Sequence, residues 1–239
     1  MTRRSFEPAG PAEPAAPAAV APPEVFEVAT APGTARVTLH RATAPARAWF
    51  VASHGAGGGI EARDLVALAA ALPARGVHVA LVEQPWRVAG RRLAPAPKTL
   101  DAGWLPVLEE IARRNTAEAL PVFGAGRSAG ARVACRTAAR TGVAGVVALA
   151  FPLHPPGRPE RSRLAELLGA GVPTLVVQGE RDTFGAPNEF PKDGPTVLPV
   201  PFADHGFAVP KRAEITQEAA LALITAGVGD WLTVPSTRE

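Results

Sequence analysis

The sequence is poor in several residue types, and each shortage argues against a class of protein. It has one cysteine, Cys135, so no intrachain disulfide can form, and we expect this side chain to be buried as a small apolar group. Tyrosine is absent, and aromatic residues make up only 5% of the chain, which disfavours base-stacking surfaces for nucleic acids. No run of about 18 uncharged apolar residues occurs, so we expect no membrane-spanning helix and no membrane partner.

The charge pattern also argues against a nucleic-acid partner. The 25 basic and 22 acidic residues leave a formal net charge of +3, and the arginines are scattered among acids.

An apolar content of 47% over 239 residues is typical of a globular domain with a sizeable core. Residues 1–24 contain six prolines and no apolar signal segment. We therefore expect a disordered tail over 1–24, one domain over 25–239 and a cytoplasmic location; the oligomeric state stays open.

Most of the chain alternates between apolar runs typical of strands and periodic runs typical of helices. A hairpin is expected over 25–30 and 35–40. Further strands are expected at 47–53, 77–83, 120–125, 144–151, 173–179 and 195–200, and helices at 61–76, about 100–114, 129–140 and 213–232. Alternating strands and helices predict an α/β fold, a mostly parallel sheet with helices on both faces.

In such a sheet ligands bind where the strands end, so the residues that follow each strand are the informative ones. Three of these segments read "GRSAG", "GERD" and "ADHG", and they supply Ser128, Asp182 and His205 in that order. Gly126 and Gly130 flank the serine at the spacing of a tight strand-to-helix turn that exposes a nucleophile. The local alternative is that Ser128 only caps the helix that follows.

A serine hydroxyl needs a base, and the base needs an acid to orient it. We expect His205 to be the base because it follows the last strand; His154 is the rival. Asp182 is the expected acid, whereas Asp204 directly precedes the histidine and would point away from it. The oxyanion of an acyl-transfer reaction needs two N–H donors.

One donor is expected from Ala129, at the start of the helix. The other is expected from Ala56 or Gly57 in "SHGAGG", where His54 would orient the loop.

The segments "SHGAGG", "GRSAGAR", "PLHPPGRPE", "QGERD" and "ADHG" resemble those of α/β-hydrolases, over roughly residues 25–233. Within that fold the chain is most similar to the dienelactone-hydrolase-like group, near the testis-expressed hydrolase-like proteins and a scaffold subunit of the non-specific-lethal chromatin complex. The resemblance implies a serine hydrolase without a large cap domain. We expect it to cleave a small carboxylic ester or thioester without a metal or cofactor.

Trp86, Arg87 and His154 lie in loops that we expect to contact the substrate. Two alternatives stay open. A protein of this fold can act as a non-catalytic interaction partner. Glycine patterns beginning at Gly124 and at Gly57 also match a dinucleotide-binding fingerprint, although that interpretation leaves Asp182 and His205 unexplained.

Overall fold

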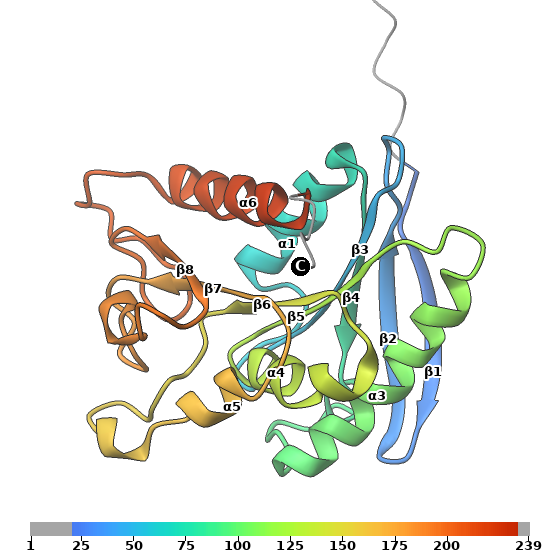
Figure 1. Cartoon of the computed structure of the whole chain (residues 1–239), viewed down its shortest axis with the longest axis horizontal. Helices are drawn as coiled ribbons and strands as arrows, with labels where there is room; N and C mark the ends of the chain where they lie inside the picture. Colours follow the sequence, from blue (N-terminus) through green and yellow to red (C-terminus); the bar gives the residue numbers. More distant parts are fainter. Residues whose placement is uncertain (1–20, 234–239) are drawn as a thin grey trace, which may run out of the picture.

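The computed structural model describes residues 21–233, and its central feature is one eight-stranded sheet (Figure 1). The strands are β1 (Glu24–Thr30), β2 (Gly33–His40), β3 (Ala48–Ser53), β4 (Val77–Glu83), β5 (Val122–Arg127), β6 (Gly145–Leu149), β7 (Thr174–Gly179) and β8 (Thr196–Val200). Their order across the sheet is β1-β2-β4-β3-β5-β6-β7-β8. The β1–β2 and β2–β4 pairs are antiparallel, and all later pairs are parallel.

Helices cover both faces of this sheet. They are α1 (Arg63–Ala71), α2 (Pro85–Val88), α3 (Pro97–Arg114), α4 (Ala129–Thr141), α5 (Leu164–Leu168) and α6 (Gln217–Thr233). In Figure 1, α1 and α6 lie on one side of the sheet, and α3, α4 and α5 lie on the other. Every residue of β3 and β6 is buried, because apolar layers pack against both of their faces.

Each face has its own hydrophobic core. Trp104 of α3 and Phe151 belong to one core, and Leu65 of α1 and Ile224 of α6 belong to the other; all four side chains are fully buried. Burying such a side chain stabilises the fold by about 1.5–3 kcal/mol, so both cores contribute substantially. The predicted α/β architecture is confirmed.

The four expected helices all differ in their bounds from the structure, and two of the differences have an identifiable cause. The segment predicted as one helix over 61–76 is α1 followed by a 3₁₀ turn, Leu72–Arg75, because Pro73 cannot donate a helical hydrogen bond. Gly76 ends it with φ of 78°, in the left-handed region. The last helix begins at 217 and not at 213, since the Thr216 hydroxyl accepts the N–H of Ala219 as a cap.

The helical segments α2 and α5 were not expected from the sequence, since runs of four and five residues carry too little periodicity to be recognised. Between β6 and β7 the chain forms only a 3₁₀ turn, Pro159–Arg161, and the short α5. Within residues 21–233, the connection between β6 and β7 therefore holds no lid domain.

Several other expectations bear on the ends and surface of the chain. Strand β1 begins at Glu24, inside the range 1–24 predicted as a tail, and residues 1–20 of that tail lie outside the described residues.

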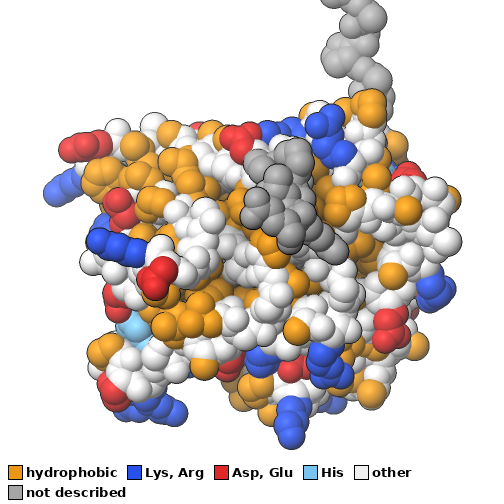
Figure 2. Space-filling model, in the orientation of Figure 1, with side chains coloured by type: hydrophobic (Ala, Val, Ile, Leu, Met, Phe, Trp, Pro, Cys, Tyr) orange, Lys and Arg blue, Asp and Glu red, His pale blue; other side chains and the backbone are white. Residues whose placement is uncertain are grey.

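Cys135 is fully buried, as predicted, and burial raises the pKa of its thiol to about 12. Within residues 21–233, no helix combines the length and apolar character needed to cross a membrane. Acidic and basic side chains are interspersed on the face shown in Figure 2.

Candidate active site

Ser128 stands at a tight turn between β5 and α4. Its φ of 53° is unusual for a residue with a side chain, and its N–H donates to the carbonyl of Leu149 at 2.9 Å. A Cβ at Gly126 would collide with the backbone of Gly130, and one at Gly130 would lie 2.5 Å from the carbonyl oxygen of Ser53. The flanking glycines are therefore required for helix α4 to start so close to the sheet.

Ser128, His205 and Asp182 form one hydrogen-bonded chain. The Nε2 atom of His205 lies 2.9 Å from the Oγ of Ser128, and its Nδ1 lies 2.8 Å from an Asp182 carboxylate oxygen. The three residues come from the loops after β5, β8 and β7, whose carboxyl ends meet at one edge of the sheet. This arrangement allows the imidazole to take a proton from the hydroxyl while the carboxylate stabilises the resulting imidazolium.

Asp182 is held in place by groups that sequence reasoning missed. Its side chain is fully buried, and its carboxylate accepts hydrogen bonds from the Gln178 amide and from the N–H of Phe184, both at 2.8 Å. The Phe184 ring lies against the His205 ring, with centroids 4.3 Å apart. These two donors fix the orientation of the carboxylate that faces the Nδ1 of His205.

Asp204, the rival acid, bonds to the backbone of its own turn. Its carboxylate accepts the N–H groups of Gly206 and Ala208 at 2.7 and 2.8 Å. It therefore shapes the turn that carries His205 instead of bonding to the imidazole.

Arg127, the residue before the serine, connects this turn to the rest of the site. Its guanidinium donates to the carbonyl of His205 at 3.0 Å and pairs with the Asp64 carboxylate of α1, with an N–O distance of 3.4 Å. The Asp64 side chain is fully buried, and this burial raises its pKa while the charge of Arg127 opposes the rise. No sequence signal pointed to this pair except an acidic residue in the first turn of an otherwise apolar helix.

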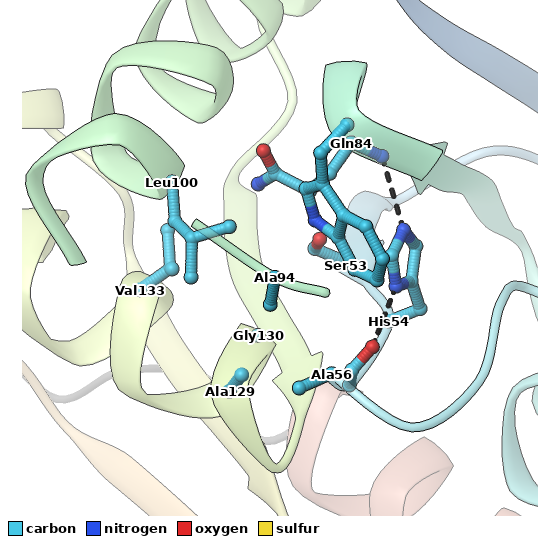
Figure 3. Close-up of a pocket in the computed structure, with 11 residues that line it drawn as sticks. Ser53, His54, Ala56, Gln84, Ala94, Leu100, Ala129, Gly130 and Val133 are labelled. Atoms are coloured by element: carbon cyan, nitrogen blue, oxygen red, sulfur yellow. Dashed lines mark hydrogen bonds between the residues drawn. The ribbon is translucent and has the colours of Figure 1, made fainter. Parts of the chain in front are cut away.

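The loop after β3 lies against the serine. A Cβ at Gly55 would be 3.2 Å from the Cβ of Ser128. The Nε2 of His54 accepts the backbone N–H of Gln84 at 3.1 Å, so its Nδ1 carries the proton and donates to the carbonyl of Gly55 at 2.8 Å (Figure 3). Burial lowers the pKa of His54, which agrees with a neutral ring.

His54 thereby fixes the peptide that follows Gly55. The peptide bond between Gly55 and Ala56 is trans, so its N–H points opposite to its carbonyl. Since the carbonyl faces His54, the N–H of Ala56 points away from the histidine. Ala56 lines a narrow cavity together with Ala129, the first residue of α4, and the roles of Ala56, Gly57 and Ala129 as oxyanion donors stay predictions.

The three residues expected to contact substrate occupy different positions. Trp86 is buried, and its ring packs edge-on against His54 with centroids 5.5 Å apart. Arg87 is paired with Glu61 at 3.2 Å near the surface. His154 has both ring nitrogens engaged, with the carbonyl of Pro155 at 2.9 Å and Glu189 at 2.9 Å, and these bonds raise its pKa. The substrate role expected for these three residues stays a prediction.

Among residues 21–233, no three His, Cys, Asp or Glu side chains gather closely enough to hold a metal ion.

Residues 46–233 match the family described as alpha/beta hydrolase domain. The chain belongs to this family. No sequence among the curated proteins matches the chain. The similar solved structures include a lidless α/β serine hydrolase from Xanthomonas campestris, 19% identical, with a TM-score of 0.67 over 93% of this chain and 99% of that one. A dienelactone hydrolase from Anabaena variabilis is also 19% identical, with a TM-score of 0.67 over 87% of this chain and 96% of that one.

A third is Est1E from Butyrivibrio proteoclasticus, 12% identical, with a TM-score of 0.62 over 88% of this chain and 99% of that one. The family is one of hydrolases, and it gives no support to the dinucleotide-binding interpretation of the glycine patterns. Gly124 and Gly126 lie in β5, before Ser128, and Ala129 begins α4 directly after it.

Proposed function

We propose that the protein is a serine hydrolase that cleaves small carboxylic esters or thioesters through an acyl-enzyme on Ser128. One observation carries the proposal: the continuous hydrogen-bonded chain from Ser128 through His205 to the buried carboxylate of Asp182. A serine held only as a helix cap needs neither an imidazole on its hydroxyl nor a strained turn, and Ser128 makes no side-chain cap hydrogen bond.

In the proposed reaction the Oγ of Ser128 attacks the ester carbonyl carbon, and its proton passes to Nε2 of His205. The N–H groups of Ala129 and Ala56 hold the oxyanion. When the tetrahedral intermediate collapses, the carbon–oxygen or carbon–sulfur bond to the leaving group breaks, and the imidazolium gives its proton to that group. Water then attacks the acyl-enzyme with the same base, which restores the serine and releases the acid.

The short connection between β6 and β7 supports a small substrate, because nothing there resembles a lid that would enclose a long lipid chain. The neighbours support the same class: one is a serine hydrolase without a lid, another a dienelactone hydrolase, and Est1E binds ferulic acid. Membership in the dienelactone-hydrolase-like group, near the testis-expressed proteins, is part of this proposal.

The test is hydrolysis of phenyl esters and thioesters of increasing acyl length by the wild type and by Ser128→Ala. We expect the wild type to cleave the short esters and the variant to show no more than the spontaneous rate. A wild type that cleaves none of them would favour the alternative of a non-catalytic interaction protein.

A further inference from the structure

A narrow cavity opens beside the two proposed oxyanion donors. It is lined by Ala56 and Ala129, continues to Ser53, Gln84 and Trp86, and is bounded by apolar side chains that include Val133 (Figure 3). We call it the Gln84 slot. Its volume is about 10 Å³, which is room for a group of about the size of one hydroxyl.

The slot gathers buried polar atoms that have no hydrogen-bond partner among the described residues. They are the Oγ of Ser53, both side-chain amide atoms of Gln84 and the indole N–H of Trp86. Gln84 is only 2% exposed. Leaving such groups unpaired is unfavourable, so several of them around one cavity indicate a site where a polar group binds.

Gln84 is packed between the loop after β3 and helix α3. Its backbone N–H is bonded to His54, and its amide oxygen lies against helix α3, where a Cβ at Gly103 would be 2.7 Å away. The carboxamide points away from His54, toward the space between Ala94 and Leu100 (Figure 3). Because the residue is buried, the carboxamide meets no bulk solvent in this conformation.

The slot lies beside Ala56 and Ala129, and this position indicates which part of a substrate would enter it. When Ser128 attacks, the carbonyl carbon lies between its Oγ and the N–H groups of Ala56 and Ala129. Ala56 and Ala129 are among the residues that line the slot, so we take a substituent on the second carbon of the acyl group as the part that enters it.

We propose that the Gln84 slot binds the hydroxyl of a short 2-hydroxyacyl group, so that the preferred substrates are esters or thioesters of small 2-hydroxy acids. This inference rests on the proposed serine hydrolase function. A hydroxyl both donates and accepts, and the slot offers an amide with both capacities, a serine hydroxyl and an indole N–H. An alkyl group there would leave these atoms unpaired, and a chain of several carbons exceeds the volume.

The experiment compares kcat/KM for phenyl glycolate, phenyl methoxyacetate, phenyl acetate and phenyl butyrate, each corrected for spontaneous hydrolysis. Glycolate and methoxyacetate both carry an electron-withdrawing oxygen on the second carbon. The ratio of their kcat/KM values therefore measures the effect of replacing the free hydroxyl by the larger methoxy group, which cannot donate a hydrogen bond. The wild type should prefer glycolate to methoxyacetate by a factor on the order of 10 to 100, and acetate to butyrate by about tenfold.

The variants are Gln84→Met, which keeps the length but loses the amide, and Ser53→Ala. Both should reduce the glycolate-to-methoxyacetate ratio by about tenfold or more. Val133→Ala widens the slot and should raise kcat/KM for butyrate relative to acetate. Each variant should still be labelled at Ser128 by a small fluorophosphonate and should keep the circular dichroism of the wild type, which shows that the nucleophile is present and the protein is folded.

The proposal is overturned if the wild type prefers methoxyacetate or butyrate, or if Gln84→Met and Ser53→Ala leave the ratio unchanged while labelling stays normal. In those cases the hydrolase function survives, because the esters are still cleaved. If the wild type cleaves no ester and Ser128 resists the phosphonate, the proposed function itself fails and the slot proposal fails with it.

Discussion

The guanidinium of Arg127 donates a hydrogen bond to the backbone carbonyl of His205 at 3.0 Å, so the residue before the proposed nucleophile holds the loop of the proposed base. The same guanidinium pairs with the buried carboxylate of Asp64 on α1. One side chain thus joins the turn after β5, the turn after β8 and the start of a helix. This connection links the backbone of His205 to the turn that carries Ser128.

Arg127→Met should lower kcat on ester substrates by about tenfold or more, because the loop of His205 loses its anchor. It should also reduce the free energy of unfolding by about 3 kcal/mol at pH 8, since Asp64 becomes a buried charge without a partner. Both effects are measurable, the first by steady-state kinetics and the second by urea unfolding.

The stability loss should depend on pH in a defined direction. Burial raises the pKa of Asp64 in the folded state, and without Arg127 it should rise further. A buried acid with a raised pKa stabilises the folded state less as pH increases from its unfolded pKa, near 4, through its folded pKa. The deficit of Arg127→Met should therefore be smaller at pH 5 than at pH 8, and Asp64→Asn in the same background should abolish the difference. An equal deficit at both pH values would contradict this account of the pair.

His205→Ala should lower kcat by a factor on the order of 10³ or more while the protein stays folded, as losses of a catalytic base do. His154→Ala is the matched control. Its ring nitrogens are engaged by Pro155 and Glu189, so its removal should affect kcat much less. The measurement is kcat with phenyl acetate, with circular dichroism as the check on folding. Reversed effects would mean that the base is His154.

Asp182→Asn should fold normally but lose about 10²- to 10⁴-fold in kcat. An asparagine can present its N–H₂ to Nδ1, which favours the tautomer whose Nε2 carries a proton and cannot accept the one from Ser128. Asp204→Asn should keep most of its turnover, since an amide oxygen can still accept the N–H groups of Gly206 and Ala208. Comparing the pH–rate profiles of the two variants checks the assignment. Near-normal kcat in Asp182→Asn together with collapse in Asp204→Asn would make Asp204 the acid.

Much of the fold could be predicted because buried strands leave a strong local signal. The bounds of β4 were predicted to the residue, and the other strands shift by a few residues at most, since each is an apolar run bounded by turn residues. The order Ser128, Asp182, His205 could be predicted for a related reason: each follows a strand, and parallel strands end at the same edge of the sheet.

The groups that support these residues could not be predicted in the same way. Gln178 lies inside β7 and bonds Asp182 four residues later, and Arg127 meets His205 across a separation of 78 residues. Such contacts depend on how side chains pack in three dimensions. The sequence shows a polar residue within an apolar run, but it does not show which residue that side chain bonds to. The same holds for Gln84 and Ser53, which come together only once β3 and β4 pair in register.

The central claim is that Ser128 is a nucleophile activated by His205, and covalent labelling tests it most directly. The full chain is incubated with a small fluorophosphonate, and mass spectrometry locates the adduct in wild type, Ser128→Ala and His205→Ala. We expect one adduct per chain on Ser128 in the wild type, none in Ser128→Ala, and labelling slowed by at least about 10²-fold in His205→Ala. A wild type that remains unlabelled, or an adduct that persists in Ser128→Ala, would contradict the account.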